Sequence, residues 1–240
     1  MNRSSPSKTV GPQSTGARLP PPPLEDPWEI AYARFETPAQ EIRKFARRLG
    51  KLGAANWSRD AEIVELFCGR GNGLNALHKL GFTRLAGVDL SSTLVAQYQG
   101  PAKLFVGDCR WLPFKNGSKD FIIVQGGLHH LGILPQDLEL TLAEISRTLR
   151  DDGVLAVVEP WLTPFLAFVH RACRFKIARR MVPKLDALAV MIDNERKTYE
   201  QWLNQPEAIV QLFKQYFSTE LYSAQWGKCL YVGRKRARSG

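Results

Sequence analysis

Cysteine is scarce in this sequence, and its copies are not spaced as pairs. Among 240 residues there are four cysteines and no CxxC motif: Cys68, Cys109, Cys173 and Cys229. This spacing fits neither a disulfide framework, as in small secreted proteins, nor a metal site built on thiolates. Cys68 is expected to be a small buried apolar residue rather than a nucleophile. The cysteines therefore indicate a cytoplasmic protein without a metal.

Long hydrophobic runs are also lacking. The best one, residues 154–169, is interrupted by Glu159, Pro160 and Pro164, so no segment is expected to span a bilayer. The polar, proline-rich N-terminus lacks the apolar core of a signal peptide. A chain of 240 residues with 44% hydrophobic residues can bury one core but hardly two. We expect a disordered Pro/Ser-rich arm over residues 1–26, one domain over 27–233 and a basic tail over 234–240.

Acidic residues are missing from two stretches that are rich in lysine and arginine. Residues 161–184 hold six basic residues and 228–240 hold five, with no acid in either, so the net charge of +10 is concentrated. Aromatic and aliphatic residues accompany the basic ones in 161–184. This composition suits peripheral contact with the inner surface of a membrane, or an apolar substrate. A helix that covers the core and turns a solvated basic face to water is an equally open alternative.

The most informative stretch that is present runs from residue 63 to residue 81. Apolar Ile63 and Val64 lead into Glu65, then into a loop with glycine at positions 69, 71 and 73, and then into a segment typical of a helix. Glycines at alternate positions let the backbone turn tightly and leave room for a ligand. A dinucleotide-binding loop would need glycine at position 74, which is leucine. An acid at the strand end instead suits a ligand that carries an ammonium group.

Three further strands are followed by polar residues. Residues 84–88 end at Asp89, residues 103–106 run into Asp108, and residues 120–124 run into Gln125. A carboxylate in the place of Asp89 can accept hydrogen bonds from both hydroxyls of a ribose. Later strands are predicted at 154–158, 220–224 and 228–232, and helices at 135–150, from Thr198 and at 206–217. Alternation of strands and helices predicts an α/β fold with a doubly wound, mostly parallel sheet of seven strands.

These four strand ends together resemble the class I S-adenosylmethionine-dependent methyltransferases, and in particular the branch of the ubiquinone and menaquinone biosynthesis enzymes. The resemblance covers residues 28–160. It implies a Rossmann-like methyltransferase fold, S-adenosylmethionine as the cofactor, and a small lipophilic methyl acceptor that is quinone- or lipid-like. Residues 161–197, after the fifth strand, are then a helical insertion that is a candidate cover for the acceptor.

The resemblance also implies roles for individual residues. Glu65 and the loop that contains Gly69, Gly71 and Gly73 would hold the methionine part of the cofactor. Asp89 would bind the ribose and Leu90 would pack on the adenine. Asp108 would accept a hydrogen bond from the adenine amino group, with Cys109 close by, and Gln125 would lie near the sulfonium.

The sequence departs from the family at two positions. The family usually has glycine at position 67 and a small polar residue at position 70, where this chain has Phe67 and Arg70. Phe67 fits if its ring points into the sheet. Arg70 either borders the cofactor pocket or points to water.

Structural roles are open for several of these residues. The three glycines could form only a tight turn, Asp89 could cap a helix that starts near residue 91, and Asp108 could cap a turn before Trp111. In the helical segments that begin at Trp28, Tyr32 and Phe35 either line the site or belong to the core.

His129 and His130 are the candidate catalytic residues. Methyl transfer needs an acceptor aligned behind the methyl group more than it needs covalent help from the protein. A base is required only if the acceptor must lose a proton. The two histidines follow the fourth strand, where an acceptor would approach, and the pKa of histidine suits this task. Catalysis by positioning alone is the alternative.

The predicted function is that of an S-adenosylmethionine-dependent methyltransferase. A nucleic-acid methyltransferase is disfavoured, because neither an Asn-Pro-Pro-Tyr motif nor a Pro-Cys nucleophile is present after the fourth strand. The paired glutamates of a protein arginine methyltransferase are also missing there. The alternative from another class is a non-catalytic cofactor-binding or membrane-associated adaptor with the same fold.

Overall fold

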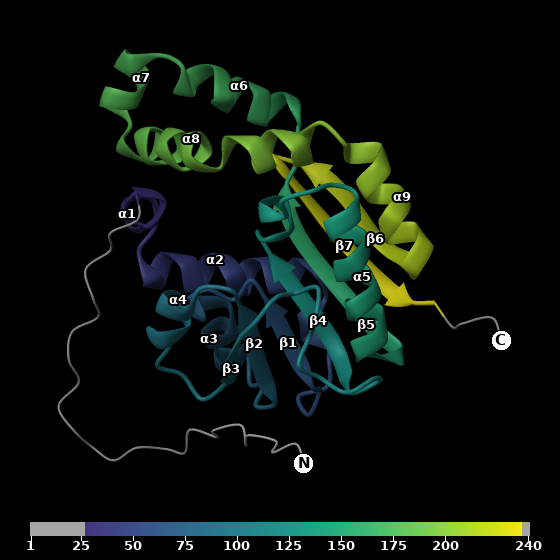
Figure 1. Cartoon of the computed structure of the whole chain (residues 1–240). Helices are drawn as coiled ribbons and strands as arrows, with labels where there is room; N and C mark the ends of the chain where they lie inside the picture. Colours follow the sequence, from purple (N-terminus) through teal and green to yellow (C-terminus); the bar gives the residue numbers. More distant parts are fainter. Residues whose placement is uncertain (1–26, 237–240) are drawn as a thin grey trace, which may run out of the picture.

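The computed structural model describes residues 27–236, which form a sheet of seven strands with helices on both faces (Figure 1). The sheet has the order β3-β2-β1-β4-β5-β7-β6, and β7 alone runs antiparallel to its neighbours. Its strands are β1 Ile63–Leu66, β2 Leu85–Asp89, β3 Lys103–Val106, β4 Lys119–Gln125, β5 Leu149–Pro160, β6 Phe217–Gln225 and β7 Lys228–Lys235. The predicted doubly wound, mostly parallel sheet is confirmed.

The described helices separate most of these strands, but four of them follow one another between β5 and β6, and two precede β1. They are α1 Pro27–Phe35, α2 Pro38–Lys51, α3 Asn72–Lys79, α4 Ser92–Ala96, α5 Gln136–Thr148, α6 Pro164–Cys173, α7 Lys176–Met181, α8 Pro183–Leu203 and α9 Pro206–Tyr216. Short 3-10 helices cover Ala54–Asn56 and Leu128–His130. The three helices α6 to α8 are the insertion that the sequence indicated after the fifth strand.

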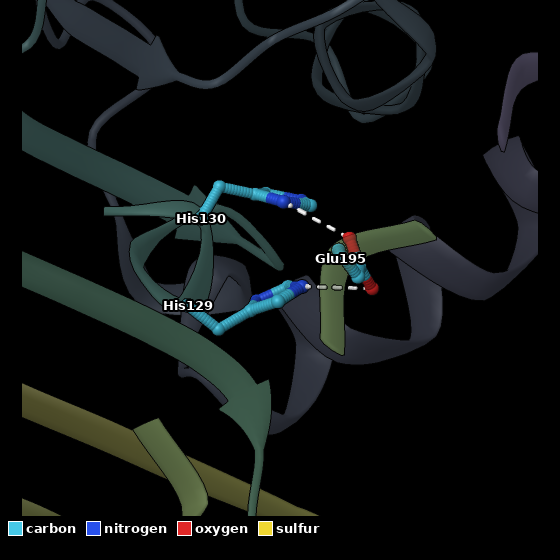
Figure 2. Close-up of side chains that lie close together, drawn as sticks. All are labelled: His129, His130 and Glu195. Atoms are coloured by element: carbon cyan, nitrogen blue, oxygen red, sulfur yellow. Dashed lines mark ion pairs between the residues drawn. The ribbon is translucent and has the colours of Figure 1, made fainter. Parts of the chain in front are cut away.

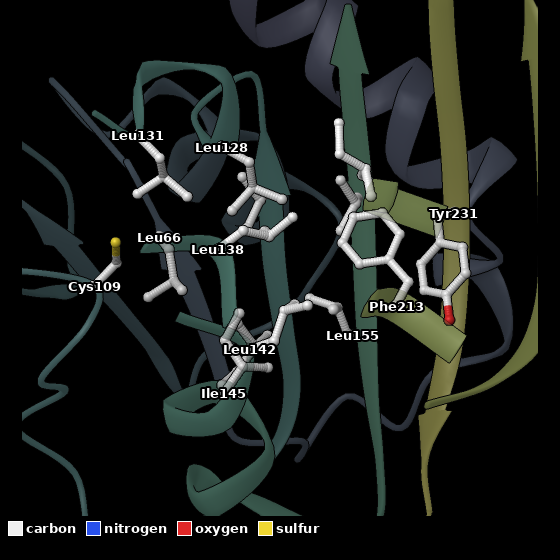
Figure 3. Close-up of a cluster of buried hydrophobic side chains, with 14 of the residues drawn as sticks. Leu66, Cys109, Leu128, Leu131, Leu138, Leu142, Ile145, Leu155, Phe213 and Tyr231 are labelled. Carbon is white, nitrogen blue, oxygen red and sulfur yellow. The ribbon is translucent and has the colours of Figure 1, made fainter. Parts of the chain in front are cut away.

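Two hydrophobic cores flank the sheet, because alternate residues of the central strands point to opposite faces. On β4, Ile122 and Val124 pack into one core while Ile123 packs into the other. The first core joins the sheet to α5 and α9 through residues such as Leu142 and Phe213 (Figure 3). The second joins it to α2 and α3. Complete burial of one such side chain contributes about 1.5–3 kcal/mol to the stability of the fold. The two cores therefore hold the strands in their positions, including the edge of the sheet at which the parallel strands end.

Several predicted boundaries differ from the structure, among them that of β6, which begins at Phe217 and not at residue 220. Strand β5 begins at Leu149, directly after α5, because residues before Val154 already continue the extended chain. Helix α8 runs through Thr198, so the predicted helix start there is wrong: the Thr198 hydroxyl donates to the Glu195 carbonyl inside the helix at 3.1 Å instead of capping a new one. Strand β7 continues to Lys235, two residues into the predicted tail. The predicted arm over 1–26 and residues 237–240 lie outside the described residues.

Helices α1 and α8 pack against each other above the carboxyl ends of the parallel strands (Figure 1). Arg34 on α1 pairs with Asp186 on α8 at 2.8 Å, and the Trp28 indole donates to Glu195 at 3.1 Å. Helix α6 is tied to the turn between β6 and β7, because the Thr163 hydroxyl accepts from the amides of both Leu166 and Gly227. These contacts hold a helical layer over the edge of the sheet where the polar strand ends meet. Within residues 27–236, no helix has the length and apolar character needed to cross a membrane.

Candidate active site

A cavity of about 1230 Å³ lies between the carboxyl ends of the strands and the helices α1, α6 and α8. Pockets for one small ligand usually measure about 300–1000 Å³, so this volume has room for two ligands. Its floor is formed by polar residues at the ends of four strands and the start of the loop after β3, namely Glu65, Asp89, Asp108, Gln125 and Glu159. Its roof is largely apolar and includes Leu166, Val169, Leu188 and Met191. Tyr32 and Phe35 on α1 also line the cavity, which agrees with the first of the two predicted alternatives, a place in the site or a place in the core.

Glu65, at the end of β1, is a buried carboxylate with an unfilled acceptor. Its Oε1 accepts from the Gln125 amide at 3.3 Å, whereas its Oε2 has no partner, and the amide oxygen of Gln125 has none either. Burial raises the pKa of Glu65 to about 8, against the weaker opposing effect of the Gln125 hydrogen bond. A cationic group placed here would satisfy both oxygens and return the carboxylate to its charged form.

The glycine loop approaches Glu65 so closely that position 73 has no room for a side chain. A Cβ atom at Gly73 would lie 1.9 Å from Glu65 Oε1. Gly71 has φ of +75° directly before α3, a conformation that favours glycine. Gly69, with the same left-handed backbone, also lines the cavity. The loop therefore packs directly against Glu65, and Gly69 is the one of the three glycines that lines the cavity, together with Arg70 and Asn72.

Asp89, at the end of β2, holds this loop in place. Its Oδ2 accepts from the Gly69 amide at 2.7 Å and its Oδ1 accepts from the Ser91 amide at 2.8 Å. The helix cap of α4 is Ser91 and not Asp89, since the Ser91 hydroxyl accepts from the Leu94 amide. Each Asp89 oxygen retains a second lone pair, so the side chain can accept further bonds from a ligand in the cavity. Leu90 is 66% exposed at the cavity wall, where a flat apolar ligand can lie against it.

Asp108 lies on the cavity wall but is already engaged by Arg110. The guanidinium contacts both carboxylate oxygens, at 2.7 Å for the shorter ion pair, and hydrogen bonds from Arg110 hold the pKa of Asp108 below its ordinary value. The Arg110 amide also donates to Asp108, which gives it the structural role considered above as well. Cys109 is buried beside the Thr141 hydroxyl at 3.5 Å, and burial raises its pKa to about 11.

Phe67 adopts φ of +54°, the conformation that glycine takes easily and that costs other residues of the order of 1 kcal/mol or more. Its ring fills the space over Gly127, where a Cβ atom would lie 2.2 Å from the ring. Arg70 borders the cavity: its guanidinium pairs with the buried Glu41 at 3.2 Å and lies over the Tyr32 ring. Phe67 and Arg70, the two residues that depart from the family pattern, thus both form part of the cavity wall.

His129 is buried and held by Glu159, a carboxylate for which no role was predicted. Its Nδ1 lies 2.7 Å from Glu159 Oε2, while Glu159 Oε1 accepts from the amides of Gly127 and Leu128, each at 2.7 Å. Because an ionised carboxylate only accepts hydrogen bonds, Nδ1 carries the proton and Nε2 is left to take another. Burial lowers the pKa of His129, but the nearby Glu159 and Glu195 outweigh it and raise the pKa above 6.5.

His130 and His129 both face Glu195 on α8 (Figure 2). Glu195 lies 3.0 Å from His130 Nδ1 and 3.8 Å from His129 Nε2. Its backbone is non-helical, with φ of −113°, and this kink in α8 turns the carboxylate toward the histidines. Among residues 27–236, these three side chains are the group that could bind a metal ion, since their ligand atoms lie within 4.8 Å of one another.

The structure thus brings together nearly all of the predicted site residues at one cavity, and it adds Glu159, Glu195, Glu41 and Arg110 to them. Glu159 could have been found, because it is an acid at the end of an apolar strand in the same position as Glu65. Glu195 had no such signal, since it reaches the site only through the kink in α8. Cys109 is near the cavity wall, although its thiol points to Thr141.

Comparisons with known proteins agree with this geometry. Residues 64–157 match the family model described as a methyltransferase domain. A Pyrococcus horikoshii protein of known structure is 20% identical, with a TM-score of 0.65 over 88% of this chain and 99% of that one. An S-adenosylmethionine-dependent methyltransferase from Methanosarcina mazei is 16% identical, with a TM-score of 0.55 over 78% of this chain and 98% of that one. No curated protein sequence matches this chain.

The structural neighbours are too distant in sequence to show more than the fold, and the family model supplies the activity. Its matched segment contains Glu65, the glycine loop, Asp89, Asp108 and Gln125. The unfilled acceptor on Glu65 fits the ammonium group of a methionine-derived cofactor. Residues 64–157 match a methyltransferase domain, and the activity that this match supports is that of an S-adenosylmethionine-dependent methyltransferase.

Proposed function

We propose that this enzyme transfers the methyl group of S-adenosylmethionine to a lipophilic, quinone- or lipid-like acceptor that lies against α6 and α8. The observation that carries the proposal is the contrast between the two sides of the cavity. Polar strand ends form the floor, whereas the helical roof offers Leu166, Val169, Leu188 and Met191. A volume of about 1230 Å³ accommodates a cofactor on the floor and an acceptor beneath the roof.

On the floor, each predicted residue has a task that its geometry supports. Glu65 and the loop of Gly69, Gly71 and Gly73 hold the methionine part, because the buried Glu65 has an oxygen without a hydrogen-bond partner that an ammonium group can fill. Asp89 accepts from the ribose hydroxyls with its remaining lone pairs, and Leu90 packs on the adenine. Asp108 accepts from the adenine amino group with lone pairs that Arg110 does not use. The oxygen of Gln125 attracts the positively charged sulfonium.

The bound cofactor supplies an activated methyl group, and the protein supplies position and proton transfer. His129 lines the cavity and takes the proton of the acceptor at Nε2, the nitrogen that Glu159 does not hold. Glu159 is a positioning residue, because it fixes the tautomer and the direction of that imidazole. The apolar roof excludes water and aligns the acceptor. His130 and Glu195 close the charge network above it.

Residues 161–184 suit the delivery of such an acceptor from a membrane surface. Seven of their large apolar side chains are exposed: Leu162, Phe165, Phe168, Phe175, Ile177, Met181 and Val182. Arg171, Arg174, Lys176 and Arg180 are exposed beside them. Apolar side chains among unopposed positive charges favour contact with anionic lipid. Phe165 also lines the cavity, so the same segment joins the surface to the site.

The proposal is tested by product analysis with methyl-labelled S-adenosylmethionine. The enzyme is incubated with a total lipid extract and, separately, with bulk protein and nucleic acid. We expect label in one apolar product of the lipid reaction and loss of that label in Glu65→Ala. Label found only in the protein or nucleic-acid fraction would overturn the choice of acceptor while leaving the methyltransferase activity intact.

A further inference from the structure

We propose that Arg48 and Lys228 form a subsite for an anionic group of the acceptor, so that the acceptor is an amphipathic acid. The inference rests on the proposed function, since it names the chemical class of the lipophilic acceptor. Both residues line the cavity, Arg48 from α2 and Lys228 from the first position of β7. Lys44 lies one turn before Arg48 on the same helix and also lines the cavity.

Arg48 and Lys228 are half-buried cations without an anionic partner. Within residues 27–236, neither side chain makes a hydrogen bond or an ion pair, whereas Lys44 pairs with Glu36. Burial lowers the pKa of Lys228 to about 7, and repulsion by Arg48 and Lys44 adds to this effect. The positive charges of Arg48, Lys44 and Lys228 therefore repel one another, and this repulsion has an unfavourable free energy that an anionic ligand would remove.

The carboxylates that act on the two cations are bound to other side chains. Glu36, Glu41 and Glu159 attract Arg48, yet burial outweighs them and lowers its pKa, and for Lys228 burial and like charges likewise outweigh the attraction of Glu36. Glu36 is bound to Lys44, Glu41 to Arg70 and Glu159 to His129. The donor groups of Arg48 and Lys228 are consequently left for a ligand.

The position of Lys228 separates it from the proposed site of the cofactor. Lys228 is on β7, three strands from Glu65 on β1 in the order β1-β4-β5-β7, which is about 14 Å at the usual spacing between strands. The ammonium and carboxylate groups of the methionine part share one α-carbon. If Glu65 holds that ammonium, the carboxylate cannot reach Lys228, so the anion must belong to the acceptor.

Apolar side chains lie next to the cations. Trp226, two residues before Lys228, packs edge-on against Phe165 at 5.5 Å between ring centroids, and both line the cavity. Leu166 lies on the next position of α6. A ligand that places its anion at Arg48 and Lys228 can therefore lay a hydrocarbon body along α6. The shared chemistry is an anionic head, carboxylate or phosphate, on an apolar chain.

Calorimetry on the full-length enzyme saturated with S-adenosylhomocysteine tests the subsite, with decanoate, decyl phosphate and decanol as probes. At least one anion should bind tenfold or more tightly than decanol, a difference of about 1.4 kcal/mol. Arg48→Gln and Lys228→Gln should remove that preference, while Arg48→Lys retains part of it. Arg43→Gln, an exposed change on the same helix, is the matched control and should behave as wild type.

A proton count gives a second readout. Near pH 7.5 Lys228 is partly neutral in the free site, so binding of an anion should raise its pKa and take up a proton. Lys228→Gln should lose this uptake. Equal or undetectable binding of the three probes, or variants that keep the preference, would overturn the subsite. Variants that instead weaken S-adenosylhomocysteine would show that the cations serve the cofactor. Absence of S-adenosylhomocysteine binding in the wild type would count against the proposed function itself.

Discussion

A single buried carboxylate, Glu65, accounts for much of the chemistry at the floor of the cavity. Burial without a cation raises its pKa to about 8, so the empty site is mostly protonated at neutral pH. Placing the acid there has a cost, because a buried group with an unfilled acceptor is unfavourable. A cationic ligand removes this unfavourable free energy when it binds, so Glu65 favours cationic ligands over neutral ones.

Binding of S-adenosylhomocysteine at pH 7 should release close to one proton. The amino group of this ligand stabilises the Glu65 carboxylate, so the pKa falls from about 8 and the group ionises on binding. Calorimetry in buffers of different ionisation enthalpy measures the number. Glu65→Gln, which has no proton to lose, is the control. A wild type that releases none would show that Glu65 does not meet the ammonium group.

Asp89→Ala should weaken S-adenosylhomocysteine binding about ten- to a hundredfold, since a charged acceptor for a ribose hydroxyl contributes roughly 1.5–3 kcal/mol. The change also releases the Gly69 amide, which loosens the loop. Calorimetry gives the affinity, and Glu139→Ala, an exposed acid on α5, is the comparison. Unchanged affinity in a folded variant would contradict the role of Asp89.

Most residues of the site could be predicted, because parallel strands end at one edge of a sheet. Glu65, Asp89, Asp108 and Gln125 were found from their positions at or just after strand ends. Glu41 and Arg48 could not be found in this way, since they reach the cavity from a helix whose packing is tertiary. Asp108 was predicted as a free acceptor, but the sequence could not show that Arg110 occupies it.

At the level of elements, α8 has a kink at the residue that faces the histidine pair. Glu195 has non-helical backbone angles, and its carboxylate lies beside both His129 and His130. The sequence predicted a helix start at Thr198, three residues from this kink, and so detected an irregularity but not its nature. Capping patterns are local, whereas a kink within a packed helix depends on its partners, here α1 and the loop after β4.

Glu195→Gln should move the pH dependence of turnover to lower pH. His129 acts as a base only when neutral, and Glu159 and Glu195 raise its pKa above 6.5 against the effect of burial. Removal of one negative charge lowers that pKa, so the rate reaches its plateau at lower pH. Rate profiles of wild type, Glu195→Gln and Glu200→Gln, an exposed neighbour on α8, provide the measurement. Superimposable profiles would show that His129 does not titrate in catalysis.

At the level of the whole molecule, the net charge of +10 is unevenly distributed. The basic residues of the insertion are not all free: Arg179 pairs with Asp186 at 2.8 Å, so it differs from its exposed neighbours. The fold as a whole could be predicted because strand and helix periodicities are local. The place of the insertion above the sheet depended on contacts of α1 with α8 that no local pattern contains.

The enzyme should bind anionic vesicles, and salt should weaken the binding, since exposed charges are screened beyond about 8 Å at physiological ionic strength. Each basic residue near such a surface contributes about 1 kcal/mol. Replacement of Arg171, Arg174, Lys176 and Arg180 by glutamine should therefore cut co-sedimentation at least tenfold. Replacement of Arg43, Arg47, Lys51 and Lys79, exposed on other helices, is the control of equal charge. Wild-type protein that ignores anionic vesicles would leave the insertion as a cover for the core.

The ring of Phe67 over Gly127 has a mechanical consequence for the enzyme. Phe67 belongs to the loop after β1, which packs against Glu65, and Gly127 belongs to the loop after β4, which carries His129. The ring fills the space between these two loops, so a shift of either loop would open a void or press the ring against the Gly127 backbone. The positions of the loop beside Glu65 and of the loop beside His129 are therefore linked through one side chain.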